Sequence, residues 1–267
     1  MHGSMIDMHC HLLPGVDDGP ADLDTALEMA RIAVADGIRF SVVTPHIEPG
    51  RYCNDKASLK QSFDEFRRAL VKAGIPLRVA LGSEVRLDLE VVAMFGREEV
   101  PFLGVVDGYE IVLLELPPTH VPVGAARYIE RLVRQRIRPL IAHPERNEDI
   151  VRDAGKLEPL LAAGSYVQLN AGSLTGQFGR PVRRRARQLL MLDVFKVLAS
   201  DGHDLSTRRP VLSDALTAAE ALIGPRAASR LVYQNPAAIV FGKRLPRRRL
   251  DVRSLREAGL AFEPRET

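Results

Sequence analysis

The sequence predicts an α/β fold built from parallel strands, and three observations carry that prediction. Strand-like and helix-like segments alternate along the chain from Met5 to Gln234. The alternation gives about seven strands, each followed by a helix. No Gly-, Ser- or Pro-rich linker interrupts it. This pattern favours right-handed crossovers between parallel strands, closed into a barrel or opened as a doubly wound sheet.

The elements follow in a regular order. The strand MIDMH precedes a helix at 22–36 that Gly37 ends, and the buried strand RFSVVTPH precedes a helix at 55–72. The later strands are LRVALGSE, YEIVLLELP, RPLIAHPER, SYVQLNAGS and FKVLASDGHD. The later helices are expected at 89–95, 123–136, 148–163, 178–191, 214–223 and 226–234.

The domain organisation is expected to be simple. Residues 5–242 are interpreted as a single domain, and residues 1–4 (MHGS) as an added leader before a natural start at Met5. Residues 243–267 form a basic C-terminal tail without a clear apolar face.

Composition excludes several functional classes. The net charge is only +3, and the basic runs RPVRRRAR and KRLPRRRLDVR are interpreted as solvated faces or as surfaces for an acidic partner or lipid headgroups. No nucleic-acid-binding signature accompanies them, and aromatic residues make up only 5%. No apolar run approaches the roughly 20 residues that a membrane span needs. Two cysteines provide no disulfide framework, so a reducing cytoplasm is expected.

Polar side chains with metal-binding chemistry stand at the ends of nearly all the predicted strands. Because the carboxyl ends of parallel strands meet at one face of a barrel, we expect these side chains to converge there. Taken singly, each would usually be a satisfied strand-end or loop residue, as we expect for His120 in the loop PPTHVP. The converging set is His9, His11, His46, Glu84, Glu115, His143, Asp201 and His203.

This set predicts a centre of two or three metal ions. Nitrogen and carboxylate ligands suit Zn, Mn or Fe. One tetrahedral ion takes about four ligands, so eight candidates imply more than one ion, with a bridging Glu. The loop motif VDDG offers a further carboxylate, either Asp17 or Asp18. Such a cluster can orient phosphate oxygens and make hydroxide available near neutral pH.

Two arginines follow ligand candidates closely. Arg146 stands three residues after His143, and Arg208 stands five residues after His203. Arg binds phosphate with a bidentate fork. Taken singly, either would usually be a surface salt-bridge residue. Beside a metal cluster we interpret both as clamps for a phosphoryl group.

Cys10 is the alternative reacting group. A thiolate phosphatase needs an Arg six positions after its Cys, but Val16 and Leu59 stand six after Cys10 and Cys53. Cys10 also alternates with His9 and His11 along a strand, so its side chain is expected to point away from the metal face.

The motifs together resemble those of the polymerase-and-histidinol-phosphatase (PHP) superfamily, and in particular its bacterial protein-tyrosine phosphatases from capsular and exopolysaccharide operons. The resemblance runs in order from residue 6 to about residue 208. The combination of HPERN with SDGH and a following Arg is specific to that branch, whereas H-x-H is shared with many amidohydrolases. The matching motifs are DMHCHLLPGVDDGP, VVTPH, GSE, LLELP, IAHPERN, NAGSLTGQFG and ASDGHDLSTR.

The resemblance implies a distorted (β/α)7 barrel of the PHP type, with the active site at the carboxyl ends of the strands. It implies three divalent ions, commonly Mn²⁺, although Fe, Zn, Mg or Co would also fit these ligands. By resemblance, one ion is held by His9, His11, Glu84 and Asp201, a second by Glu84, Glu115 and His143, and a third by His46, His203 and Asp18, or Asp17 in its place.

The implied reaction is hydrolysis of phosphotyrosine by direct attack of a metal-bound hydroxide, without a cysteinyl-phosphate. Arg146 and Arg208 would grip the phosphoryl group. The implied substrate is the tyrosine-rich tail of a membrane-associated bacterial tyrosine kinase that regulates capsule or exopolysaccharide synthesis. The enzyme would be cytoplasmic and would reach the membrane only through that partner.

Three alternatives stay open at the level of sequence. A small-molecule phosphomonoesterase of the histidinol-phosphatase kind would share the metals and need a closed site. An amidohydrolase-type hydrolase would bring a carboxylated Lys at a strand end, where this sequence has none. A scaffold without activity would not need candidate ligands at every one of these positions.

Overall fold

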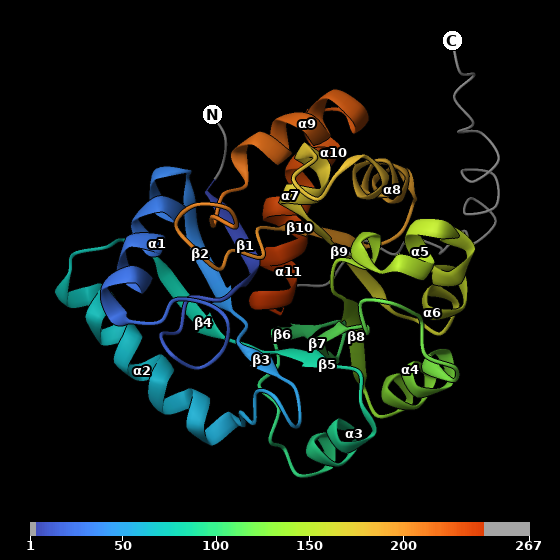
Figure 1. Ribbon diagram of the computed structural model, residues 1–267, viewed down its shortest axis with the longest axis horizontal. Coiled ribbons are helices and arrows are strands. Elements are labelled where there is room, and N and C mark those ends of the chain that lie inside the picture. Colours follow the sequence, from blue (N-terminus) through green and yellow to red (C-terminus); the bar gives the residue numbers. More distant parts are fainter. Residues whose placement is uncertain (1–3, 243–267) are drawn as a thin grey trace.

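Parallel strands organise residues 4–242, which the computed structural model describes (Figure 1). A three-stranded sheet has the order β1-β2-β4, and a larger sheet has the order β10-β9-β8-β7-β5-β3. Strand β6 pairs with β7 and is antiparallel to it. The strands are β1 (Met5–Cys10), β2 (Ile38–Val43), β3 (His46–Ile47), β4 (Arg78–Leu81), β5 (Glu84–Arg86), β6 (Gly104–Val106), β7 (Tyr109–Glu115), β8 (Ile137–Ile141), β9 (Tyr166–Asn170) and β10 (Lys196–Ala199).

Backbone hydrogen bonds join the two sheets at both edges. On one side the chain runs directly from β2 into β3 and from β4 into β5, and the amide of Glu84 in β5 donates to the carbonyl of Pro45 in the connection between β2 and β3 (3.1 Å). On the other side the amide of Asp201 donates to His9 and the amide of His11 donates to Gly202, each at 2.8 Å. The predicted α/β class with parallel strands is confirmed. The distorted barrel stays a prediction, which these bonds favour.

Helices surround the strands (Figure 1). Two begin at aspartates that the sequence placed at helix starts: Asp22 accepts from the amide of Thr25, and Asp55 forms a capping box with Ser58. The longer helices are α1 (Leu23–Ala35), α2 (Lys56–Lys72), α3 (Leu89–Gly96), α4 (Ala125–Arg134), α8 (Arg180–Met191) and α9 (Ser213–Ile223). Among the described residues, no helix has the length and apolar character that a membrane crossing requires.

Several predicted boundaries are wrong. The single helix expected at 148–163 is broken at Asp153, whose extended backbone and side-chain bond to the amide of Gly155 start a new turn. The strand SYVQLNAGS ends at Asn170, which caps the next helix. Strand β6 and the last helix were not predicted. The shorter elements are η1 (Pro144–Arg146), α5 (Glu148–Arg152), η2 (Ala154–Leu157), α6 (Glu158–Ala162), α7 (Ala171–Thr175), α10 (Pro225–Ser229), η3 (Arg230–Gln234) and α11 (Asn235–Val240).

Alternation along the strands divides the core into two clusters. On β7, Val112 and Leu114 belong to the larger buried cluster, which includes residues of α1, α2 and α4. Ile111 and Leu113 point to the opposite face and belong to a smaller buried cluster, which includes residues of α11. Because successive side chains point to opposite faces, Glu115 continues the row of Ile111 and Leu113. Polar side chains at the ends of such rows therefore share one end of the fold. The predicted leader (except Ser4) and the predicted basic tail lie outside the described residues.

Candidate metal centre

All the predicted metal ligands lie together at the carboxyl ends of the strands. They form three overlapping groups in which the candidate ligand atoms lie within 4.8 Å of one another. Most of the side chains are buried, whereas 38% of the Asp18 side chain is exposed. The groups are His9, Glu84, His143 and Asp201; His11, Asp18, His46 and His203; and His46, Glu84 and Glu115.

Glu84 is the most connected of these side chains. Its Oε1 lies 3.1 Å from Nε2 of His143, and its Oε2 lies 3.2 Å from Nε2 of His9 and 3.2 Å from Nδ1 of His46. Nε2 of His11 lies 3.4 Å from the same Oε2. Both carboxylate oxygens thus face imidazole nitrogens, as a carboxylate shared between two ions would.

The grouping differs from the one that the resemblance implied. His143 stands with His9 and Asp201, and His11 stands with Asp18, whose Oδ1 lies 3.3 Å from His46 and 3.4 Å from His203. Two candidate ligands have a positive φ: 27° at His143 and 53° at Asp201. Such a conformation is unfavourable for a non-glycine residue and is often found at functional sites.

Asp17 and Asp18 have different surroundings. Oδ2 of Asp17 accepts from Nδ1 of His11 (2.7 Å) and from the amide of His46 (3.0 Å), behind the cluster. Asp18 faces His46 and His203 directly. Gly19 makes this arrangement possible, because a Cβ at that position would lie 2.8 Å from the carbonyl oxygen of His11. The geometry favours Asp18 as the ligand and Asp17 as the residue that orients His11.

Hydrogen bonds through Nδ1 direct the Nε2 atoms of three histidines into the cluster. Oε1 of Gln168 accepts from Nδ1 of His9 (3.1 Å), and the carbonyl of Asp201 accepts from Nδ1 of His203 (2.8 Å). Asp17 does the same for His11. With Nδ1 protonated, each Nε2 keeps a lone pair. A carboxylate or carbonyl behind a histidine is the usual partner of a metal-binding imidazole.

Buried atoms at the cluster that make no hydrogen bond of normal geometry also fit a cation. They are Oδ1 of Asp201, Oε2 of Glu115 and Nε2 of His203, and each lies within 3.4 Å of an ionisable side chain. Burial and the neighbouring charge of Glu84 raise the pKa of Glu115 to about 9. Buried carboxylates that cannot be ionised together in the protein alone become stable anions beside a divalent ion. The residues present therefore fit oxygen- and nitrogen-bound metal ions.

Both predicted clamp arginines reach one carboxylate oxygen. Oδ2 of Asp201 lies 2.6 Å from Nη1 of Arg146 and 2.8 Å from Nη2 of Arg208. The side-chain amide of Asn170 donates to the same oxygen (2.7 Å). The guanidinium of Arg146 also stacks over the ring of Phe178, 4.3 Å from its centroid. The other oxygen of Asp201 faces His9 at 3.3 Å.

Four supporting residues were missed from the sequence. Gln168 and Asn170 lie on β9 and hold His9, His143 and Asp201 in place. Arg86 pairs with Glu115 (3.0 Å), and Asp7 accepts from the hydroxyl of Ser200 (2.5 Å) beneath the cluster. The signal that could have found Gln168 and Asn170 is a polar residue in step with an inward-facing apolar position of the same strand, here Tyr166.

Cys10 lies outside this cluster, as predicted. Its Sγ donates to the carbonyl of Val42 (3.6 Å), and its side chain belongs to the same buried cluster as Val112 and Leu114. Burial raises the pKa of this thiol well above its usual value, so it stays protonated. His120 is exposed in its loop and is not among the three groups, as also predicted.

The chain is similar to several known proteins. The family model described as capsular polysaccharide synthesis, CpsB/CapC, matches residues 5–241. The tyrosine-protein phosphatase YwqE of Bacillus subtilis is 36% identical over 82% of this chain and 85% of its own length. The tyrosine-protein phosphatase CpsB of Streptococcus pneumoniae is 25% identical over 89% of this chain and 98% of its own.

A solved structure is also similar. It comes from work on YwqE of Bacillus subtilis and CpsB of Streptococcus pneumoniae, which are described as unique metal-dependent tyrosine phosphatases. It superimposes with a TM-score of 0.84 at 33% identity and covers 92% of this chain and 97% of its own. An inactive dihydroorotase-like domain from Chaetomium thermophilum, at 11% identity and a TM-score of 0.54, shares the fold alone.

Proposed function

The chain belongs to the CpsB/CapC family of capsular polysaccharide synthesis proteins, and we propose that it is a metal-dependent protein-tyrosine phosphatase. One observation carries the proposal: nine nitrogen- and oxygen-bearing side chains form three groups with metal-binding spacing, and Glu84 and His46 each belong to two of these groups. The name shared by the YwqE and CpsB relatives supports the reaction class, and their description as metal-dependent supports the use of ions.

The proposed cofactors are two or three divalent ions, with Mn²⁺ the first choice. Their ligands would be His9, His11, Asp18, His46, Glu84, Glu115, His143, Asp201 and His203. Bound ions of this kind polarise phosphoryl oxygens and make hydroxide available near neutral pH. The chain supplies the fixed positions: Gln168, Asp17 and the carbonyl of Asp201 hold three imidazoles with Nε2 directed into the cluster.

Arg146 and Arg208 are proposed to bind the phosphoryl group of the substrate. Their guanidinium groups approach from the same side, because both contact Oδ2 of Asp201. A forked donor can keep one N–H on that carboxylate and offer others to a phosphate oxygen. The two arginines would thereby neutralise charge on the equatorial oxygens and keep Asp201 oriented towards His9.

The proposed substrate is a phosphotyrosine protein, and more narrowly the tyrosine-rich tail of a membrane-associated bacterial tyrosine kinase that controls capsule or exopolysaccharide synthesis. The family's description in capsular polysaccharide synthesis supports this choice. Arg180, Arg184 and Arg187 are exposed on α8 and offer a basic face to an acidic tail, whereas Arg185 of the same run is buried. A kinase tail on the inner side of the membrane would place the enzyme in the cytoplasm.

Removing the metal tests the proposed function. Protein treated with a chelator should lose at least about a hundredfold in hydrolysis of p-nitrophenyl phosphate and of a phosphotyrosyl peptide, and Mn²⁺ should restore both. Metal content is measured alongside by mass spectrometry. Full activity without metal would contradict the proposal. A Mn²⁺-loaded protein that hydrolyses histidinol phosphate but neither of these substrates would make it a small-molecule phosphatase instead.

The variant Cys10→Ser is expected to keep at least about half of the wild-type kcat, because the side chain is buried outside the cluster and its thiol stays protonated. The hydroxyl of Ser can still donate to the carbonyl of Val42. The measurement is steady-state hydrolysis of p-nitrophenyl phosphate. A loss of activity as large as that of His143→Ala, in a protein with normal thermal stability, would restore the thiolate mechanism.

A further inference from the structure

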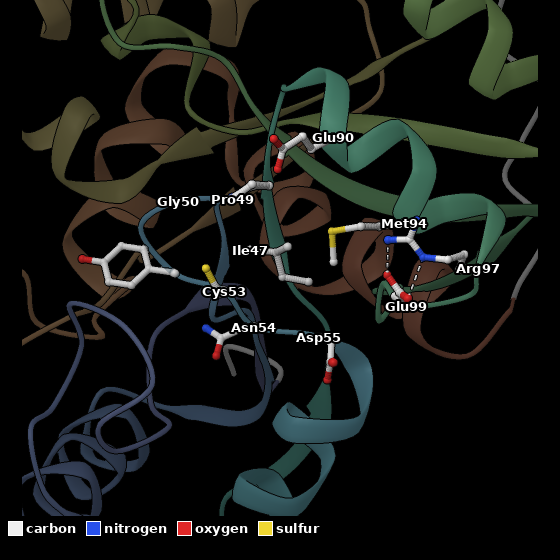
Figure 2. A pocket seen from close by; sticks show the side chains of 11 residues that line it. Ile47, Pro49, Gly50, Cys53, Asn54, Asp55, Glu90, Met94, Arg97 and Glu99 are labelled. Atoms are coloured by element: carbon white, nitrogen blue, oxygen red, sulfur yellow. Dashed lines mark hydrogen bonds and ion pairs between the residues drawn. The ribbon is translucent and has the colours of Figure 1, made fainter.

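A cavity of ≈ 280 Å³ lies beside the segment that directly follows His46, and Figure 2 shows the side chains that line it. One wall is the segment 47–55, which continues from β3 to the start of α2. The other wall consists of residues of α3, including Met94, and of residues just after α3, including Arg97. None of the side chains that we assign to the metal ions or to the phosphate lines it. The cavity is therefore a separate feature.

The ring of Tyr52 connects this cavity to the candidate metal centre. Tyr52 lines the cavity, and its ring stacks on the ring of His46 with centroids 5.4 Å apart and planes 11° apart. The neighbouring Asn54 donates to the carbonyl of His46 (2.8 Å), which ties the wall to the ligand. An extended peptide advances about 3.3–3.6 Å per residue. A peptide with its phosphotyrosine at the metal centre can therefore place a nearby side chain in the cavity.

The lining is apolar in the middle and acidic at its edges. Figure 2 shows Ile47 between Cys53 and Met94, with the carboxylates of Glu90 and Asp55 on opposite sides of it. Arg97 donates two hydrogen bonds to Glu99 (2.7 and 2.8 Å), so these two charges offset each other. Glu90 and Asp55 leave a net negative charge around the cavity, while the carboxylate of Asp55 also accepts from the amide and hydroxyl of Ser58 as the cap of α2.

We propose that this cavity binds the side chain of a Lys or Arg that stands within about two residues of the phosphotyrosine in the protein substrate. Such a side chain lays its aliphatic stem along apolar surface and keeps its charged end beside carboxylates. A Glu at that one position would meet Glu90 and Asp55 with like charge. The inference rests on the proposed phosphatase function and names the sequence preference of the same site.

Peptide substrates give the first test. Phosphotyrosyl peptides with Lys, Ala or Glu at each flanking position are compared on the Mn²⁺-loaded enzyme, with p-nitrophenyl phosphate as the internal reference because it has no flanking residues. At one position kcat/KM should be about fivefold higher for Lys than for Ala, and lower again for Glu. Glu90→Gln should bring the Lys-to-Ala ratio close to one. Glu28→Gln, the same change on the exposed face of α1, should leave that ratio as in the wild type.

Cys53 gives a second test that does not depend on turnover. Cys53 is exposed in the cavity and Cys10 is buried, so a maleimide should label Cys53 selectively. A non-hydrolysable phosphonate peptide with Lys at the preferred position should slow this labelling at least about fivefold relative to its Glu counterpart. Labelled enzyme should lose the Lys preference, and maleimide-treated Cys53→Ser should keep it.

The outcomes separate the two hypotheses. Equal kcat/KM for Lys, Ala and Glu peptides, or labelling of Cys53 at the same rate with and without the Lys peptide, would overturn the cavity's role even in an active enzyme. A protein that hydrolyses neither peptide nor p-nitrophenyl phosphate would instead contradict the proposed function. In that case the labelling rates still decide whether the cavity binds a basic side chain.

Discussion

The variant Glu84→Gln is expected to lose more than about 10³-fold in kcat and to bind at least one metal ion fewer than the wild type. Loss of a residue that only supports a metal ligand lowers metal affinity or activity by about 10–100-fold. Glu84 faces four imidazoles directly, so its loss should cost more. Gln keeps the size of the side chain but carries no charge and replaces one oxygen with an NH₂ group, which cannot bind a cation. Kinetics with p-nitrophenyl phosphate and metal analysis by mass spectrometry measure the two effects.

A matched control separates this effect from damage to the fold. Glu130→Gln makes the same change on α4, where the carboxylate is 50% exposed and pairs only loosely with Arg134 (3.6 Å), so kcat and metal content should stay as in the wild type. The apo form of Glu84→Gln should still unfold cooperatively but melt below the apo wild type, because the surrounding imidazoles hold the pKa of the buried Glu84 carboxyl well below its usual value and lose that charged partner. Full metal content together with wild-type kcat in Glu84→Gln would contradict the proposed centre.

The candidate ligands could be predicted from the sequence because strand ends in a parallel fold are equivalent positions. His46, Glu84, Glu115 and His143 each follow an apolar run, and the fold brings the carboxyl ends of these runs together whatever the details of the helices. The alternation of side chains along β1 also correctly predicted that the side chain of Cys10 points away from the face of His9 and His11. Both inferences need only the direction and the period of a strand.

The supporting residues could not be predicted in the same way. The bond between Gln168 and His9 joins residues 159 positions apart, and the pairing of Arg86 with Glu115 depends on how two strands are staggered. The grouping of His11 with Asp18 follows from the path of a loop, which Gly19 allows by its close approach to the His11 backbone. Contacts of this kind depend on three-dimensional packing, and the spacing of residues along a single sequence does not reveal them.

The same limit explains the misplaced helix boundaries. Asp153 ends α5 because its side chain bonds to the amide of Gly155, a competing local bond that an apolar pattern does not register. Asn170 ends β9 and caps α7 while its side-chain amide donates to Asp201. At this position the end of a strand, the start of a helix and the orientation of a candidate ligand depend on one side chain.

The variants Arg146→Ala and Arg208→Ala are each expected to lower kcat/KM by about 10²–10³-fold, because each removes a preorganised donor from the group that develops charge in the reaction. Lysine replacements should recover little of this loss, since a point charge cannot hold Asp201 and a phosphate oxygen at once. The double variant should lose less than the sum of the two free energies, because both arginines contact the same oxygen. Arg152→Ala, an exposed arginine of α5, is the control and should leave kcat/KM unchanged.

Metal content and product inhibition distinguish the two roles of these arginines. If they act on the phosphoryl group, inhibition by inorganic phosphate should weaken in both alanine variants while the bound metal stays at the wild-type level. If they act only by orienting Asp201, metal affinity should fall instead, and Asn170→Ala should reproduce that fall because Asn170 donates to the same oxygen. Unchanged phosphate inhibition together with reduced metal affinity would reassign Arg146 and Arg208 from binding the substrate to positioning a ligand.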